Sequence, residues 1–195
     1  EDRFKEIGLV PKGYQNNYTQ TFTFRPSSNP HEQAEFTGLK SDSTLTGTNV
    51  IGFIDNKAST TVVIGAHYDH LGMGGEGSLY REEKPAVHNG ADDNASGVAV
   101  MLNLASKLMD AIEENTKNNN YLFIAFSGEE MGLLGSNYFV KNSTVDKNGI
   151  TYMINMDMVG RLNEENTIAV HGVGTSPIFK QTLFANNDYG LTIAE

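Results

Sequence analysis

The chain has 195 residues, no cysteine, and a formal net charge of −10 from 24 acidic and 14 basic residues. A chain of this length corresponds to little more than one domain. The absence of cysteine excludes disulfide bonds, thiolate metal ligands and a cysteine nucleophile. The acidic balance argues against a nucleic-acid partner. Apolar runs are too short for a membrane span, and no basic segment leads into an apolar stretch, so we expect no signal peptide in this chain.

The first part of the chain predicts a short helix and one amphipathic strand. Residues 1–7 are typical of a helix that ends at Gly8. Residues 18–24 alternate large side chains with threonine, which indicates a strand with one apolar face. Residues 26–47 are polar and rich in turn-forming residues, so we expect a loop there.

Most of the remaining chain alternates apolar strands with helices. Near-continuous apolar runs predict strands covered on both faces, at residues 50–54, 61–66, 121–126 and 150–156 and, more weakly, 167–170 and 191–194. Apolar residues spaced by three and four predict a helix over 98–112, capped by Asn94 or Ser96. Further helices are expected at 132–141 and after Ser176. This alternation predicts an α/β sandwich.

Residues 71–90 form a glycine-rich polar segment between a strand and a helix. Gly72, Gly74 and Gly77 match the pattern G-x-G-x-x-G of dinucleotide-binding proteins. That interpretation requires the helix to begin within the segment, but polar residues and Pro85 intervene. We therefore expect a flexible loop beside a site.

Ionisable side chains gather where the predicted strands end and where the long helix begins. They are His67, Asp69, Asp92, Asp93, Glu129, Glu130 and Asp157. In open α/β sheets, ligands bind beyond the carboxyl ends of the strands. We therefore expect these segments, which are far apart in the sequence, to converge on one place.

Taken singly, most of these side chains have an ordinary structural explanation. The His67–Asp69 pair is compatible with a surface pair, and acidic pairs ahead of helices are favoured as caps and by the helix dipole. Asp157 is harder to explain, because a carboxylate inside an apolar strand costs several kcal/mol unless it is paired or metal-bound. Together, one imidazole and several carboxylates form a ligand set that suits zinc or a similar divalent ion.

At these residues the sequence resembles the bacterial leucyl aminopeptidase family of co-catalytic zinc exopeptidases. Four motifs carry the resemblance in the family's order and spacing, at residues 63–70, 89–97, 127–130 and 155–158. The resemblance extends over nearly the whole chain. It implies a three-layer α/β/α sandwich around a mixed, largely parallel sheet, with residues 1–195 as a single zinc-peptidase catalytic domain.

The resemblance also implies a role for each of the gathered side chains. Two zinc ions would be held by four metal ligands, namely His67, Asp92 as the bridging carboxylate, Glu130 and Asp157. Glu129 would be the general base, and Asp69 would orient the imidazole of His67. A cis peptide bond between Asp92 and Asp93 is expected as well.

One feature of the family is missing from this chain. The family takes a final histidine ligand from a segment near its C-terminus, but here the sequence stops at Glu195. The other histidines suit different roles: His31 lies in a polar loop, His70 and His88 flank the glycine-rich segment, and His171 ends a weak strand. We therefore expect a C-terminally truncated domain with a weakened second zinc site and little activity by itself.

The resulting prediction is a zinc metallo-aminopeptidase, a hydrolase whose partner is a peptide substrate with a free N-terminus. The resemblance indicates an exported enzyme, periplasmic or secreted. Two alternatives stay open: an enzyme like glutaminyl cyclase with one zinc ion, and a non-catalytic binding module on the same fold.

Overall fold

The computed structural model describes residues 1–26, 34–74, 78–84, 86–111 and 114–195. The chain divides into two compact units, Glu1–Met158 and Val159–Glu195. The first unit contains the large sheet and the side chains predicted to form the site. The single-domain organisation expected for residues 1–195 stays a prediction.

Within the described residues, the sheet of the first unit has seven strands, in the order β3-β2-β4-β6-β5-β7 with β1 paired to β4. Their bounds are β1 Val10–Pro11, β2 Thr19–Arg25, β3 Glu35–Thr37, β4 Leu45–Ile54, β5 Thr61–His67, β6 Asn120–Phe126 and β7 Ile150–Asn155. The pairings of β1 to β4, β2 to β3, β2 to β4 and β4 to β6 are antiparallel, whereas β5 is parallel to both β6 and β7. The sheet is mixed, as predicted, but its parallel part is confined to one half.

Helices cover this sheet on both faces. The helices of the first unit are α1 Asp2–Ile7, α2 Gly97–Asp110 and α3 Leu134–Lys141. Shorter helical turns are η1 Tyr14–Asn16, η2 Ala91–Ser96, η3 Glu114–Asn118 and η4 Lys147–Gly149. In the described residues, no helix is both long enough and apolar enough to cross a membrane.

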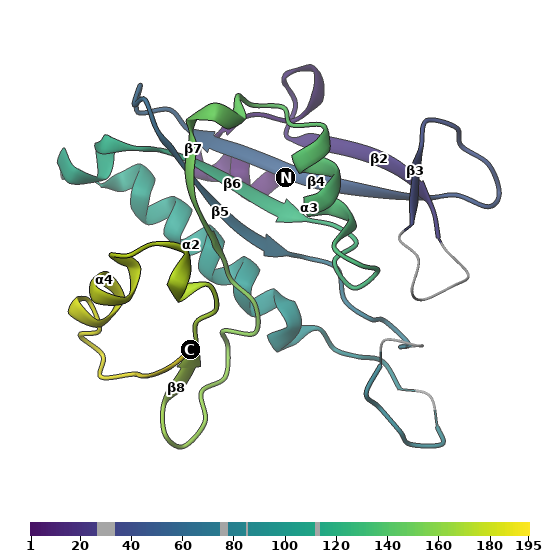
Figure 1. Cartoon of the computed structure of the whole chain (residues 1–195). Coiled ribbons are helices and arrows are strands. Elements are labelled where there is room, and N and C mark those ends of the chain that lie inside the picture. Colours follow the sequence, from purple (N-terminus) through teal and green to yellow (C-terminus); the bar gives the residue numbers. More distant parts are fainter. Residues whose placement is uncertain (27–33, 75–77, 85, 112–113) are drawn as a thin grey trace. The chain divides into compact units, whose positions relative to one another are not determined.

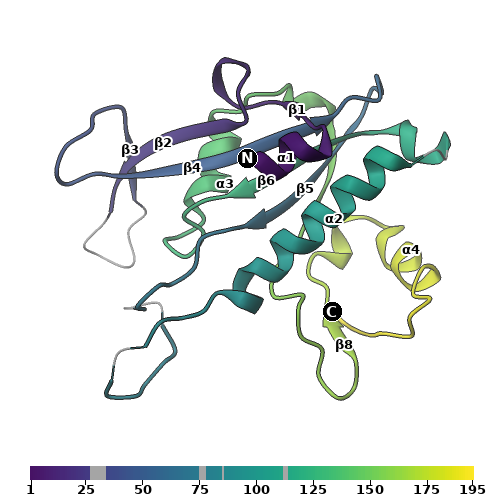
Figure 2. The same cartoon turned by 180° about the vertical axis from the view of Figure 1, so that it is seen from behind.

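Successive residues of β6 face opposite layers, and this alternation defines the three-layer sandwich. Phe123 and Ala125 pack in one core cluster with Met101 and Ala105 of α2. Leu122, Ile124 and Phe126 pack in a second cluster with Phe139 of α3. Figure 1 shows α3 in front of the sheet, and Figure 2 shows α1 in front of the opposite face. A strand with both faces covered reads as a continuous apolar run, which is why β6 was predictable.

The expectation of a loop over residues 26–47 was wrong in part. Strand β4 begins at Leu45, and Glu35–Thr37 form the short strand β3. Residues 45–48 alternate with threonine and pair with the threonine-rich part of β2. Such polar alternation is a weak strand signal in the sequence, and here the neighbouring strand decides the structure.

The second unit is small. It contains η5 Val173–Thr175 and α4 Phe179–Ala185, and a two-stranded parallel sheet of β8 Thr167–Ala169 and β9 Thr192–Ala194. The two weak strands predicted near the C-terminus are thus present, and they pair with one another. The predicted third helix is also present, but it begins at Phe179 rather than directly after Ser176.

Candidate metal centre

His67 is the last residue of β5 and has only 2% of its surface exposed. Its Nδ1 lies 3.1 Å from the backbone oxygen of Asp69. A carbonyl oxygen only accepts hydrogen bonds, so Nδ1 is the donor and carries a proton. In the neutral ring this leaves the lone pair on Nε2, which is the atom available to a metal ion.

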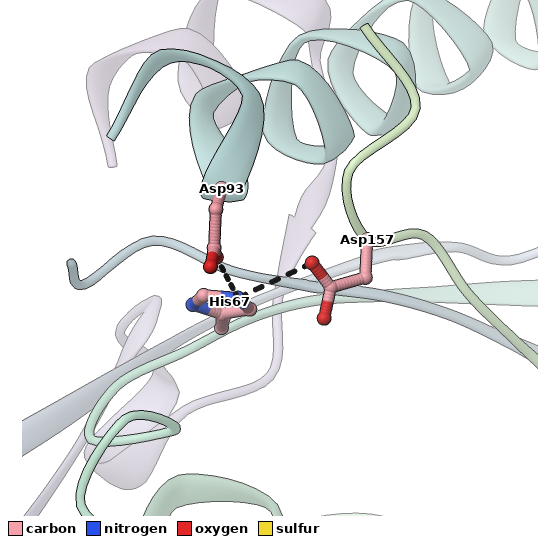
Figure 3. Close-up of side chains that lie close together, drawn as sticks. All are labelled: His67, Asp93 and Asp157. Carbon is pink, nitrogen blue, oxygen red and sulfur yellow. Dashed lines mark ion pairs between the residues drawn. The ribbon is translucent and has the colours of Figure 1, made fainter. Parts of the chain in front are cut away.

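Three carboxylates approach Nε2 of His67. The distances are 3.1 Å to Oδ1 of Asp93, 3.6 Å to Oδ1 of Asp157 and 4.0 Å to Oε2 of Glu129. Figure 3 shows Asp93 and Asp157 reaching the imidazole from two different segments. The ligand atoms of His67, Asp93 and Asp157 all lie within 4.8 Å of one another.

The parallel half of the sheet brings these segments together. His67 of β5 lies beside Phe126 of β6, so the chain leaves both strands at the same edge. Strand β7 runs parallel to β5 on the other side, and its end is held by a hydrogen bond from the Met156 N–H to the Gly65 carbonyl, at 2.9 Å. Ionisable side chains from remote parts of the chain therefore meet near the carboxyl ends of parallel strands, as predicted.

Asp69 connects the end of β5 to the turn that follows β6, residues 127–130, which we call the glutamate segment. Its Oδ1 accepts a hydrogen bond from the backbone N–H of Glu129, at 3.1 Å, and its Oδ2 accepts one from the N–H of Glu130, at 3.3 Å. The chain enters this turn through Gly128, whose φ of 70° is a conformation that favours glycine. Asp69 thus fixes the start of the glutamate segment relative to β5.

Burial and the clustered charges shift the pKa values of several side chains at the site. Burial lowers the pKa of His67, but the side chain of Asp69 and the charges of Glu129 and Asp157 outweigh it and raise that pKa to about 9. Burial raises the pKa of Glu129 and that of Glu130. Burial also acts to raise the pKa of Asp69, but the nearby imidazole of His67, whose Nδ1 lies 3.7 Å from Oδ1, and the hydrogen bonds from the two glutamate N–H groups bring that pKa below the usual range.

The ligand set fits zinc. One imidazole nitrogen and two carboxylate oxygens are three protein ligands, the number found in catalytic zinc sites that keep an open position. The second ring nitrogen of His67 is held by a carbonyl oxygen, as is usual for histidines that bind metals. Several carboxylates around one imidazole also leave an excess of negative charge that a divalent cation would balance.

The structure differs from the sequence analysis in the aspartate that it brings to His67. Asp93 lies in this group, whereas Asp92 does not. The expected cis peptide bond between Asp92 and Asp93 is also absent, since the cis bond joins Asp93 to Asn94. The resemblance assigned these roles one residue too early, and the irregular backbone angles of η2 at Asp93 and Asn94 are not encoded in the motif. In this turn the side chain of Asn94 is buried, whereas Oδ1 of Asp93 lies 3.1 Å from Nε2 of His67.

The position of Asp157 also differs from the expectation. Strand β7 ends at Asn155, so Asp157 lies beyond the strand, and its side chain is 43% exposed. The argument from burial inside an apolar strand was therefore wrong, although the residue does lie at the site. The backbone N–H of Glu130 donates a hydrogen bond to Asp69 beside the site. In the described residues, however, Glu130 is not part of the three-residue ligand group.

The remaining candidates lie outside the ligand group. Nδ1 of His70 accepts a hydrogen bond from the Gly72 N–H at 3.0 Å, and Nε2 of His88 lies 2.7 Å from Oγ of Ser78. His171 belongs to the second unit. His31, and the Gly77 and Pro85 of the glycine-rich segment, lie outside the described residues.

A cavity of about 140 Å³ adjoins the site on the side of α3. Its polar lining comes from His67, Glu129, Ser136 and Asn155, and its apolar side chains come from Phe126, Leu133 and Met153. The glutamate that lies closest to His67 therefore borders a space with an apolar wall.

The chain is similar to known metallopeptidases in sequence and in fold. Over 117 residues it is 34% identical to a probable leucine aminopeptidase from Arthroderma otae, covering 59% of this chain and 30% of that relative. It is similar to the structure of a zinc aminopeptidase from Bacillus subtilis, with 25% identity and a TM-score of 0.57, covering 83% of this chain and 37% of the other. The structure of Porphyromonas gingivalis glutaminyl cyclase gives a TM-score of 0.69 at 20% identity, covering 100% of this chain and 63% of the other.

The three-layer fold is thus the fold of zinc-dependent exopeptidases. The profile of peptidase family M28 matches residues 49–195, and the chain belongs to that family. The prediction of a zinc peptidase with relatives among the leucine aminopeptidases is confirmed at this level. The match to the Arthroderma otae protein spans about 30% of its length.

Proposed function

We propose that the whole protein is a zinc-dependent aminopeptidase that removes N-terminal residues from peptides with a free N-terminus. The observation that carries the proposal is the convergence of Asp93, Asp157 and Glu129 on Nε2 of His67. Membership of peptidase family M28 and the leucine aminopeptidase relatives support it.

In this proposal His67, Asp93 and Asp157 would hold one zinc ion, and Glu130 together with Asp93 would contribute to a second one. The role expected for Asp92 would pass to Asp93, because Asp93 is the aspartate beside His67. Zinc, when bound, supplies a Lewis acid that polarises the scissile carbonyl and makes water more acidic.

Glu129 is the general base in the proposed reaction. Its carboxylate takes a proton from the attacking water, whose oxygen bonds to the carbonyl carbon, and passes that proton to the nitrogen of the leaving amine as the C–N bond breaks. Burial raises the pKa of Glu129, which makes its carboxylate a better proton acceptor. Asp69 keeps this base in place through the hydrogen bond from the Glu129 N–H.

The test is hydrolysis of a leucine anilide by the whole protein loaded with zinc. The Glu129→Gln variant should retain its zinc and lose about 10²- to 10⁴-fold in turnover, the usual contribution of a general base. A matched control is Glu164→Gln, which changes an exposed glutamate of the second unit and should leave turnover unchanged. Undiminished turnover in Glu129→Gln would remove this residue from the mechanism, and a wild-type protein that binds no zinc would overturn the proposal.

One observation favours a second candidate function, that of a single-zinc enzyme like glutaminyl cyclase. Within the described ranges, the side chains form one three-residue ligand group, which is enough for one metal ion. Metal analysis distinguishes the candidates, together with assays on the leucine anilide and on a peptide with N-terminal glutamine. One zinc ion per chain and cyclisation of the glutamine peptide would favour the cyclase.

A further inference from the structure

Asn94 is a buried residue that contacts the segments of two metal-ligand candidates. It follows Asp93 directly, and only 1% of its surface is exposed. Its Nδ2 donates a hydrogen bond to the carbonyl of Met156, at 3.0 Å, and its Oδ1 accepts one from the N–H of Met158, at 3.3 Å. Met156 and Met158 are the neighbours of Asp157 on either side. Asn94 is therefore covalently joined to one ligand residue and hydrogen-bonded on both sides of the other.

We infer that Asn94 is a positioning residue that sets the separation of Asp93 and Asp157 and thereby the zinc affinity of the site. The inference rests on the proposed metal-binding role of those two aspartates. Their side chains are 42% and 43% exposed, so burial alone does not hold them in place. Fixing the backbone beside each carboxylate reduces the entropy that is lost when both bind one ion.

The alternative is that Asn94 only caps helix α2. Its Oδ1 does accept a third hydrogen bond, from the N–H of Gly97 at 3.1 Å, at the first turn of that helix. A cap needs that bond alone, and the bonds to Met156 and Met158 add nothing to it. The Met156 segment also packs closely against the start of helix α2, because a Cβ on Gly97 would collide with Oδ1 of Asn94 and with the Met156 carbonyl.

The chain offers a matched control at the other end of the sheet. Asn120, at the first residue of β6, is also buried. Its Oδ1 accepts hydrogen bonds from the N–H groups of Asn56, at 3.0 Å, and Ala58, at 3.2 Å, and its Nδ2 donates to the Ala58 carbonyl, at 2.9 Å. Asn94 and Asn120 thus make the same set of backbone hydrogen bonds, but only Asn94 lies beside the ligands.

The experiment measures zinc affinity by competition with a chromogenic chelator, and the stability of the metal-free protein by chemical denaturation. Asn94→Ala and Asn120→Ala should both lower the stability, because each leaves backbone groups without their partner. Only Asn94→Ala should also weaken zinc binding, by about 10- to 100-fold, the usual effect of losing an outer-shell partner. Equal zinc affinity in Asn94→Ala and the wild type would overturn the inference.

A second variant separates positioning from capping and decides the question if Asn94→Ala does not fold. Asn94→Ser keeps a hydroxyl that can accept from the Gly97 N–H, as serine does at helix caps, but it is too short to hold Met156 and Met158. Relative to Asn94→Ala, it should recover part of the stability without recovering zinc affinity, whereas full recovery of both would overturn the inference. A wild-type protein that binds no zinc is a different result, which refutes the proposed function itself.

Discussion

The two halves of the sheet differ in how they use their side chains. The antiparallel half, β1 to β4, contributes an aromatic cluster in which Phe22 packs against Phe24, Phe36 and Tyr138. The parallel half, formed by β5 and its neighbours, ends in His67 and leads into the segments of Glu129 and Asp157. Antiparallel neighbours finish at opposite ends, whereas parallel neighbours finish together, so the ionisable side chains of the site collect where the parallel strands end.

The two halves are connected by a buried asparagine of the antiparallel half. Asn49 of β4 is fully buried, and its Nδ2 donates to Oε1 of Gln20, at 3.0 Å, and to the Gly135 carbonyl, at 2.8 Å. Its Oδ1 accepts from the N–H of Ser127, at 3.2 Å, two residues before Glu129. Through Asn49, the antiparallel half thus holds both the start of the glutamate segment and α3 in position.

The largest expected effect tests the stabilising role of the antiparallel half. Phe22→Ala removes a buried ring that stacks on Tyr138 with ring centroids 4.8 Å apart, and should lower the free energy of unfolding by about 3–5 kcal/mol. Zinc affinity of the folded protein should not change. Leu45→Ala, an exposed position in the same half, should cost no more than about 0.5 kcal/mol. A large loss of zinc affinity in Phe22→Ala would show that the antiparallel half also determines zinc binding.

A second prediction tests the binding role of the parallel half and the register of the motif. Asp93→Asn removes the carboxylate nearest to Nε2 of His67 and should weaken zinc binding more than about 100-fold, beyond the usual loss from an outer-shell partner. Asp92→Asn changes the neighbouring residue, which lies outside the ligand group, and should have a much smaller effect. Chelator competition measures both variants. A larger loss of zinc affinity in Asp92→Asn than in Asp93→Asn would instead assign the ligand role to Asp92.

The smallest expected effect concerns a hydrogen bond at the edge of the aromatic cluster. The hydroxyl of Tyr14 lies 3.1 Å from that of Tyr138, and burial together with this bond raises the pKa of Tyr138 to about 12. Tyr14→Phe should lower that pKa, as measured by absorbance titration, and cost about 0.5–1.5 kcal/mol of stability.

The sign of the pH effect follows from the raised pKa of Tyr138. In the unfolded chain the phenol titrates near 10, so the contribution of Tyr138 to stability is complete below pH 10 and is lost as the pH rises toward 12. The Tyr14→Phe variant should therefore lose less stability than the wild type between pH 10 and 12. An identical loss in both proteins would contradict the role given to Tyr14.

Strands and helices with strong periodicity were predictable from the sequence. Strand β6, with both faces covered, and helix α2, with its apolar stripe, were expected nearly at their observed bounds. The start of β4 and the whole of β3 were missed, because Thr46, Thr48 and Thr37 give little hydrophobic signal and their strands depend on pairing with β2. Pairing between distant segments is a tertiary effect that local patterns do not encode.

The candidate site was predictable as a set of segments but not residue by residue. His67 was expected at the end of β5 and Asp157 inside an apolar strand; the two side chains do meet, although Asp157 lies beyond the end of β7. The choice between Asp92 and Asp93 depended on the backbone of a single irregular turn, which no spacing rule determines. Asn94 was expected only as a helix cap, because its bonds to Met156 and Met158 join segments far apart in the sequence.

The link between Asp69 and the glutamate segment has a mechanical consequence. His67 and Phe126 are neighbours in the β5–β6 pair, and both oxygens of Asp69 are bonded to the turn that follows Phe126. Because of these bonds, we expect a thermal twist of the sheet to move the imidazole and the Glu129 backbone together. In an ensemble of conformations their motions would be correlated, and the spacing between His67 and Glu129 would fluctuate less than either position does alone.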